Sequence, residues 1–97
     1  MSFIQLIEYT TSRNDEFNVL VDEWLAATEG KRSTGRAAMC SDRDGTNRYV
    51  EIVEFPSYED AMANSALPET AAFAERMGKL CDGEPTFRNL DVLRTVE

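Results

Sequence analysis

Residues 49–73 read YVEIVEFPSYEDAMANSALPETAAF, and this stretch decides the fold. It opens with seven residues that are mostly β-branched, aromatic or aliphatic, which is typical of a buried strand. Pro56 ends the strand, and Ser57 with an aspartate three residues later indicates the start of a helix. The residue before Pro68 disfavours helical geometry, whereas Pro68 itself suits a first helical turn. We therefore expect one strand followed by two short helical pieces.

The flanking sequence supplies the remaining elements. Apolar residues recur at helical spacing in residues 15–27, where Ser12 and Asp15 resemble a weak capping box. Strands are also predicted at residues 3–9, 36–41 and 86–93, and the strand before Pro56 spans residues 48–55. The order strand, helix, strand, strand, helix, strand predicts an α+β, ferredoxin-like βαββαβ fold with a four-stranded antiparallel sheet. Both crossovers then place their helices on one face of the sheet.

Two of the predicted strands are apolar on both faces, although a half-exposed antiparallel strand should alternate. In the first strand Phe3 and Ile7 share one face, while Ile4 and Leu6 share the other. The strand at residues 48–55 has the same property, so these two are predicted to be central. A second copy of the chain is the simplest cover for the helix-free face, and we expect a sheet-to-sheet homodimer. The alternative is a monomer whose edge loops fold over the sheet.

Composition narrows the classes of protein. The 97 residues suit one domain spanning residues 1–97. A net charge of -8 argues against nucleic-acid binding, since an acidic surface repels phosphates. No apolar run is long enough to span a membrane, and the N-terminus lacks a basic leader. We therefore expect a cytoplasmic protein without membrane or nucleic-acid partners.

The chain contains no histidine, which removes the commonest metal ligand, haem ligand and general base together. We predict that it uses neither metal nor cofactor. Glu51 then stands out, because its position in the strand points it into an otherwise apolar layer. A buried carboxylate must find a partner or keep its proton. Glu51 either forms an inter-strand or inter-subunit ion pair, with Arg88 or Arg36 as its partner, or is a general base in a pocket.

Other side chains are open to two interpretations. Trp24 lies on the apolar face of the first helix, where it is either a core residue or a pocket wall whose indole N–H seeks a partner. Asn64 ends a short helix, where it either caps a turn or meets a ligand. Tyr49 is expected to pack with its hydroxyl at a rim.

The layout, with a strand ending in Phe-Pro-Ser-Tyr-Glu-Asp-Ala followed by a small-residue break before proline, resembles the dimeric α/β-barrel superfamily. It is most similar to antibiotic-biosynthesis monooxygenase (ABM) domains. Many of these carry histidines where this chain has Asn64 and Glu69. The haem-degrading branch carries a tryptophan and an iron-ligating histidine at the places of Asn64 and Phe73, so the resemblance does not extend to haem chemistry.

The resemblance implies a cofactor-independent monooxygenase that holds an aromatic or polyketide-like substrate in an apolar pocket. Asn64, Trp24, and Arg36 or Arg88 supply the polar residue types that this resemblance implies, and Glu51 adds a candidate base from the strand pattern. We therefore predict catalytic roles for Asn64, Glu51 and Arg88, and substrate binding by Trp24, Tyr49, Phe73 and Arg36. The alternative is a non-catalytic barrel that binds a small apolar ligand or has a structural role. An enzyme predicts a pocket with Trp24 and at least one polar group pointing in. The alternative predicts a solid core, or a cavity lined by apolar atoms alone.

Overall fold

The computed structural model describes residues 2–33 and 35–97. In these residues the elements run β1 (Phe3–Thr10), α1 (Asn14–Ala27), β2 (Ala37–Ser41), β3 (Arg48–Phe55), α2 (Tyr58–Ser65), α3 (Pro68–Leu80) and β4 (Thr86–Asp91). The predicted α+β, ferredoxin-like order is confirmed, with the second helical segment split before Pro68 as expected. The last strand ends at Asp91 rather than at Leu93. Met1 and Thr34 lie outside the described residues, so the loop predicted at residues 31–35 is described only in part.

The sheet is four-stranded with the order β2-β3-β1-β4, and every neighbouring pair is antiparallel. The prediction that the two apolar strands are central is therefore confirmed. Register places Ile7 opposite both Glu51 and Phe87, and these side chains share one face. Leu6 lies opposite Ile52, and these side chains share the other face.

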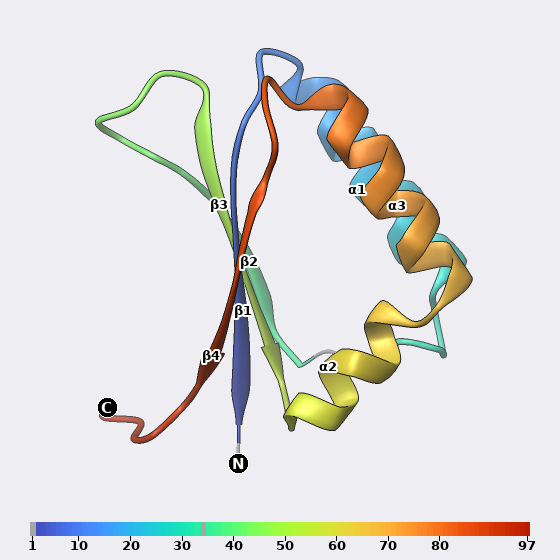
Figure 1. The fold of residues 1–97 in the computed structure, drawn as a ribbon, viewed down its shortest axis with the longest axis vertical. Coiled ribbons are helices and arrows are strands. Elements are labelled where there is room, and N and C mark those ends of the chain that lie inside the picture. Colours follow the sequence, from blue (N-terminus) through green and yellow to red (C-terminus); the bar gives the residue numbers. More distant parts are fainter. Residues whose placement is uncertain (1, 34) are drawn as a thin grey trace.

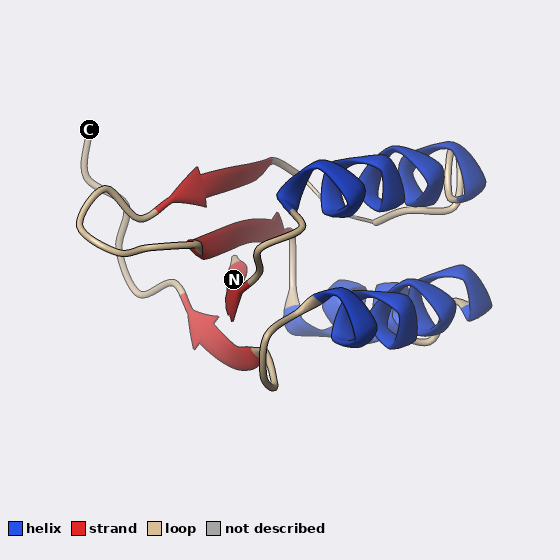
Figure 2. Ribbon diagram, turned by 90° about the horizontal axis from the view of Figure 1, so that it is seen from above, coloured by secondary structure: helices blue, strands red, loops and turns tan. Residues whose placement is uncertain are grey.

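All three described helices cover the same face of the sheet, while the other face is bare in the single chain (Figure 1). Seen from above, the molecule has one layer of strands and one layer of helices (Figure 2). Helices α1 and α3 run side by side, and α2 lies near the end of β3 (Figure 1). No helix within residues 2–33 and 35–97 is long and apolar enough to cross a bilayer.

The buried core between the two layers forms two separate clusters. One joins β1 to α1 and α3 through Ile7, Tyr9, Phe17, Leu20 and Met77. The other joins β1, β3 and α2 through Phe3, Phe55 and Ala61. The two clusters thus pack different parts of the layer between sheet and helices.

The two predicted helix starts have different outcomes. Ser57 caps α2 as expected, because its Oγ accepts the Asp60 N–H at 3.1 Å. The capping box predicted at Ser12 is wrong, since α1 starts at Asn14 and no side chain caps it. The backbone N–H of Ser12 instead donates to Asp82 Oδ2 at 3.0 Å. Thr11 Oγ1 donates to the Leu80 carbonyl, so this loop is tied to the end of α3 and Ser12 lies outside the helix.

Replacing Ser57 by alanine should destabilise the protein by about 1 kcal/mol, because it removes the acceptor for one N–H of the first turn of α2. For a domain of this size that corresponds to a fall in Tm of roughly 4–8 °C. Ser12→Ala is the matched control and should leave Tm unchanged, since α1 has no side-chain cap. Thermal unfolding followed by circular dichroism measures both, and equal shifts would contradict the assignment.

Candidate functional site

A pocket of about 480 Å³ lies between the helix-covered face of the sheet and the helices. Its walls are mostly apolar and include Ile7, Val53, Phe55, Phe73, Met77 and Phe87. The lining runs from Ala37 on one edge strand to Phe87 on the other, so the pocket extends beneath the whole sheet. Three strand spacings of roughly 4.8 Å make that width about 14 Å. Such a volume and length suit a small molecule with several rings.

Small side chains on α3 leave this space open. Thr70, Ala71 and Ala74 line the pocket where longer side chains would reach across it. The bulky residues of α3 pack into the core instead, with Met77 fully buried and Phe73 packed against the same cluster. The pocket therefore follows from the choice of residues on one helix face.

Trp24 forms one wall of the pocket. Its indole N–H donates to Thr70 Oγ1 at 3.1 Å, which supplies the partner that a partly buried tryptophan needs. Its ring lies 5.8 Å from the ring of Phe73, centroid to centroid. The hydrogen bond to α3 fixes the orientation of the indole, so its face is a preformed surface for a flat ligand.

Arg32 is the cation that lines the pocket. Its guanidinium carbon lies 5.5 Å from the centroid of the Trp24 ring, within cation–π range. Its Nη1 donates to the Leu25 carbonyl at 2.7 Å and to Thr28 Oγ1 at 3.0 Å, at the end of α1. These contacts hold a positive charge at the pocket wall.

Glu51 lies in the middle of β3 and lines the pocket from the sheet side. Its Oε2 is buried and has no hydrogen-bond partner among the described residues. Burial raises the pKa of Glu51 above its ordinary value, because the charged form loses hydration. Burial, and secondly the charge of Glu51, also raise the pKa of Tyr9, whose hydroxyl therefore stays neutral. Such an unpaired carboxylate at a pocket wall is chemically suited to proton transfer.

Asn64 faces the same pocket from the last turn of α2. It is only 7% exposed, and its Oδ1 is buried with no partner within the part of the chain that the structure describes. A buried amide oxygen without a partner costs about 1–3 kcal/mol. A ligand that donates a hydrogen bond to Asn64 would remove this cost.

The remaining predicted residues lie elsewhere. Arg88 lies on the bare face of the sheet, 3.9 Å from Glu8, and Arg36 is an exposed residue 4.0 Å from Glu54. Within one chain, therefore, neither arginine pairs with Glu51, and the ion-pair interpretation of that residue is wrong for the monomer. Tyr49 stacks on Tyr9 at 5.6 Å, outside the pocket, as a packing residue. The pocket brings together Trp24, Glu51, Asn64 and Phe73 from the predicted set.

The basic cluster of Lys31, Arg32 and Arg36 in the sequence indicates either an anion site or, more simply, a solvated loop, so Arg32 is not singled out there as a pocket residue. The small residues of α3 were missed. Arg32 lies in a polar loop, where nothing local distinguishes it from a solvated arginine. Thr70, Ala71 and Ala74 did carry a signal, because small residues on the sheet-facing side of an amphipathic helix predict an unfilled space. Among the described residues, no group of three or more His, Cys, Asp and Glu side chains could hold a metal ion.

The sequence matches no family model and no curated protein, but its fold matches solved structures closely. SnoaB, a cofactor-independent oxygenase from Streptomyces nogalater, aligns with a TM-score of 0.82 at 17% identity over 98% of this chain and 96% of its own. A candidate antibiotic biosynthesis monooxygenase from Caulobacter crescentus aligns at 0.82 and 12% identity over 96% and 91%. Rv0793 from Mycobacterium tuberculosis aligns at 0.81 and 12% identity over the whole of both chains.

The chain thus has the fold of the ABM domains, and the resemblance seen in its sequence is confirmed at that level. At these identities the likeness is one of architecture.

Proposed function

We propose that this protein is a cofactor-independent monooxygenase that oxidises an aromatic, polyketide-like phenolic substrate. The observation that carries the proposal is the pair of buried, unpartnered acceptors, Glu51 Oε2 and Asn64 Oδ1, in an otherwise largely apolar pocket. A purely apolar ligand would leave both acceptors without partners, whereas a phenolic one satisfies them. The oxygenase named among its structural neighbours, SnoaB, has the same fold.

The chemistry of the pocket follows from these two groups. The carboxylate of Glu51 takes a proton from a CH₂ group of the substrate that is made acidic by the aromatic rings beside it. The resulting carbanion is delocalised onto the phenolic rings. Asn64 Oδ1 accepts a hydrogen bond from a phenol O–H of the substrate, and the amide N–H of Asn64 donates to the oxygen that gains charge. Trp24 and Phe73 line the pocket and pack against the substrate rings. The apolar walls exclude water, which strengthens both polar interactions.

Dioxygen is the oxidant. It accepts one electron from the carbanion and then combines with the carbon radical, forming a C–O bond. The peroxide anion takes back the proton from Glu51, and loss of the second C–H proton with cleavage of the O–O bond releases a ketone and water. One oxygen atom enters the product and the other enters water, so the CH₂ group loses four electrons and dioxygen gains them.

The direct test is oxidation of 1,8-dihydroxyanthrone in air-saturated buffer with EDTA, followed by oxygen uptake and quinone absorbance. The expected result is uptake of one O₂ per quinone at a rate well above that in buffer alone. Asn64→Ala should lower kcat by about 10²–10³, as removal of an oxyanion donor does. Asn18→Ala, an exposed asparagine on α1, is the matched control and should be fully active. A wild-type rate equal to that of the buffer blank would refute turnover of this substrate class.

The alternative function is ligand binding without turnover. It predicts that the same anthrone saturates the pocket and quenches Trp24 fluorescence while oxygen uptake stays at the blank rate. The polar groups at the pocket wall favour the enzyme, since a carrier of apolar ligands gains nothing from an unpaired carboxylate.

We also propose that two copies of residues 1–97 form a homodimer through the bare face of the sheet. That face presents the half-buried Ile4, Leu6, Val50 and Ile52 together with Leu90, which is 41% exposed. The turn between β2 and β3 and the C-terminal residues both project from this side of the sheet (Figure 1). The tail carries Leu93 and Val96, which are 88% and 75% exposed. A second copy would cover this apolar surface, which is costly to leave in water.

A further inference from the structure

We infer that the pocket selects ligands that carry an anionic group, such as a carboxylate or sulfonate beside the aromatic rings, and that Arg32 recognises that group. The inference rests on the proposed function of the same pocket and names a property of its substrate. In this assignment Arg32 determines specificity and takes no part in the oxidation.

The charges on the pocket wall are few and have distinct chemical uses. Of the described residues that line it, Arg32 supplies the only positive charge and Glu51 the only carboxylate. No ion pair joins these two side chains in the part of the chain described. The chain as a whole carries a net charge of -8, so an anionic ligand gains nothing from the general field. A local cation is therefore what would make the pocket accept an anion.

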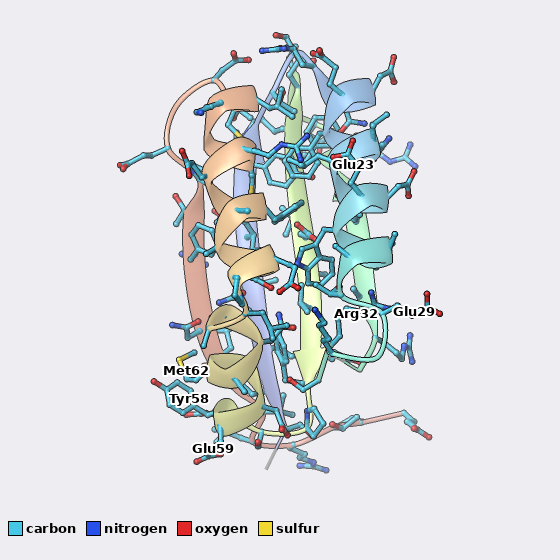
Figure 3. All side chains as sticks on the ribbon, turned by 90° about the vertical axis from the view of Figure 1, so that its right-hand side faces the viewer. Glu23, Glu29, Arg32, Tyr58, Glu59 and Met62 are labelled. Atoms are coloured by element: carbon cyan, nitrogen blue, oxygen red, sulfur yellow. The ribbon has the colours of Figure 1, made fainter. Side chains whose placement is uncertain are left out.

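The loop around Arg32 is anchored on both sides. Lys31 Nζ contacts Glu69 Oε2 of α3 at 2.6 Å, and Ser33 Oγ donates to the Asp60 carbonyl of α2 at 2.7 Å. Between these anchors, Arg32 lies in the space between α1 and the α2–α3 pair (Figure 3). Consecutive residues thus bind three different helices, and the guanidinium is held at the pocket wall.

A second role for Arg32 must be separated from recognition. Its Nη1 satisfies carbonyl and hydroxyl acceptors at the end of α1, where a cation also suits the negative end of the helix dipole. These bonds use only Nη1. Among the described residues no acceptor is bonded to Nε or Nη2 of Arg32. These two guanidinium nitrogens can therefore donate a pair of hydrogen bonds to an anionic ligand.

The test uses two fluorescent probes that share an aromatic skeleton and differ in one charge. They are 8-anilinonaphthalene-1-sulfonate and its neutral counterpart N-phenyl-1-naphthylamine, each titrated against the protein with energy transfer from Trp24, the single tryptophan, as the signal. Arg32→Gln should weaken binding of the sulfonate about tenfold or more and change that of the neutral probe less than about twofold. Arg32→Lys keeps the charge but loses the paired N–H donors of the guanidinium. Its affinity for the sulfonate should therefore lie between those of wild type and Arg32→Gln.

Two control variants locate the effect. Arg36→Gln removes the same charge from an exposed position that does not line the pocket, and should change neither probe. Ala71→Phe places a ring in the pocket and should weaken both probes. The Tm of each variant reports the helix-end role separately, because a residue that only caps α1 would lower Tm without changing the ratio of the two affinities.

The outcomes distinguish the two levels of the proposal. If Arg32→Gln weakens both probes equally, or neither, recognition of an anion by Arg32 is wrong while the pocket stands. If the wild-type protein binds neither probe, or if Ala71→Phe has no effect on either, the pocket is not a binding site, and the proposed function fails with the inference. Selective loss of the sulfonate in Arg32→Gln alone supports both.

Discussion

Glu51→Gln is expected to lower kcat for oxidation of 1,8-dihydroxyanthrone by about 10²–10⁴, because a neutral amide of the same size cannot take the substrate proton. The wild-type rate should fall as the pH drops through the raised pKa of Glu51, since only the carboxylate is a base. Oxygen uptake measured across the pH range checks both. Glu54→Gln, a change of the same charge on the opposite face of β3, is the control and should be active.

The Glu51→Gln variant should also be more stable than wild type at neutral pH. Because the pKa of Glu51 is raised in the folded protein, the native state binds this proton more tightly than the unfolded chain does. The stability from the protonated carboxyl is complete below the ordinary glutamate pKa and is lost as pH rises through the raised one. Glu51→Gln removes that loss, so its Tm should exceed that of wild type at neutral pH, by roughly 4–8 °C for each 1 kcal/mol of stability gained. The gain should vanish in acid, below both pKa values.

A less active but more stable Glu51→Gln variant would show that the carboxylate is kept at a cost to stability, as functional groups in pockets are. Equal activity of Glu51→Gln and wild type would instead assign the proton transfer to another group. A variant that is both inactive and less stable would mean that the carboxylate has a structural partner, and the base assignment would fail.

Ile52→Lys is expected to convert the proposed dimer into a monomer. Ile52 lies at the centre of the bare face, opposite Leu6 and Ala38 on the neighbouring strands. Two-fold symmetry would bury two lysine charges between the apposed sheets, each costing several kcal/mol. The dimer Kd should therefore rise by at least about 10³. Sedimentation velocity at micromolar concentration should show wild type at about twice the 10.9 kDa chain mass and the variant at that mass.

The control for this experiment is Val19→Lys, which introduces the same charge at a residue of α1 that is 57% exposed and should leave the dimer intact. The pocket is lined by residues of one chain, including Glu51 and Val53 on the opposite face of β3, so monomeric Ile52→Lys should still bind the probes. A wild-type protein that sediments as a monomer would rule out the dimer. A dimeric Ile52→Lys protein would place the interface on another surface.

Local features of the sequence determined the architecture. The periods of the apolar residues and the two proline breaks predicted the order of the elements, and the two strands that are apolar on both faces predicted the centre of the sheet. These signals are readable because they depend on neighbours in the chain. The failed cap at Ser12 shows the limit, since contacts with Leu80 and Asp82 decided where that helix begins.

The candidate site was only partly readable from the sequence. Glu51 was conspicuous as a charge in an apolar strand, and Trp24, Asn64 and Phe73 also line the pocket. The sequence could not separate Arg32 from Arg36 and Arg88, because an arginine in a loop or on a strand has the same local signature whether it faces a pocket, a sheet rim or water. Which arginine faces the pocket is set by the strand registers and by the contacts that hold the loop of Arg32. Both involve residues far apart in the chain. The fold was thus determined by local sequence, whereas the cation that faces the pocket was decided by the tertiary structure alone.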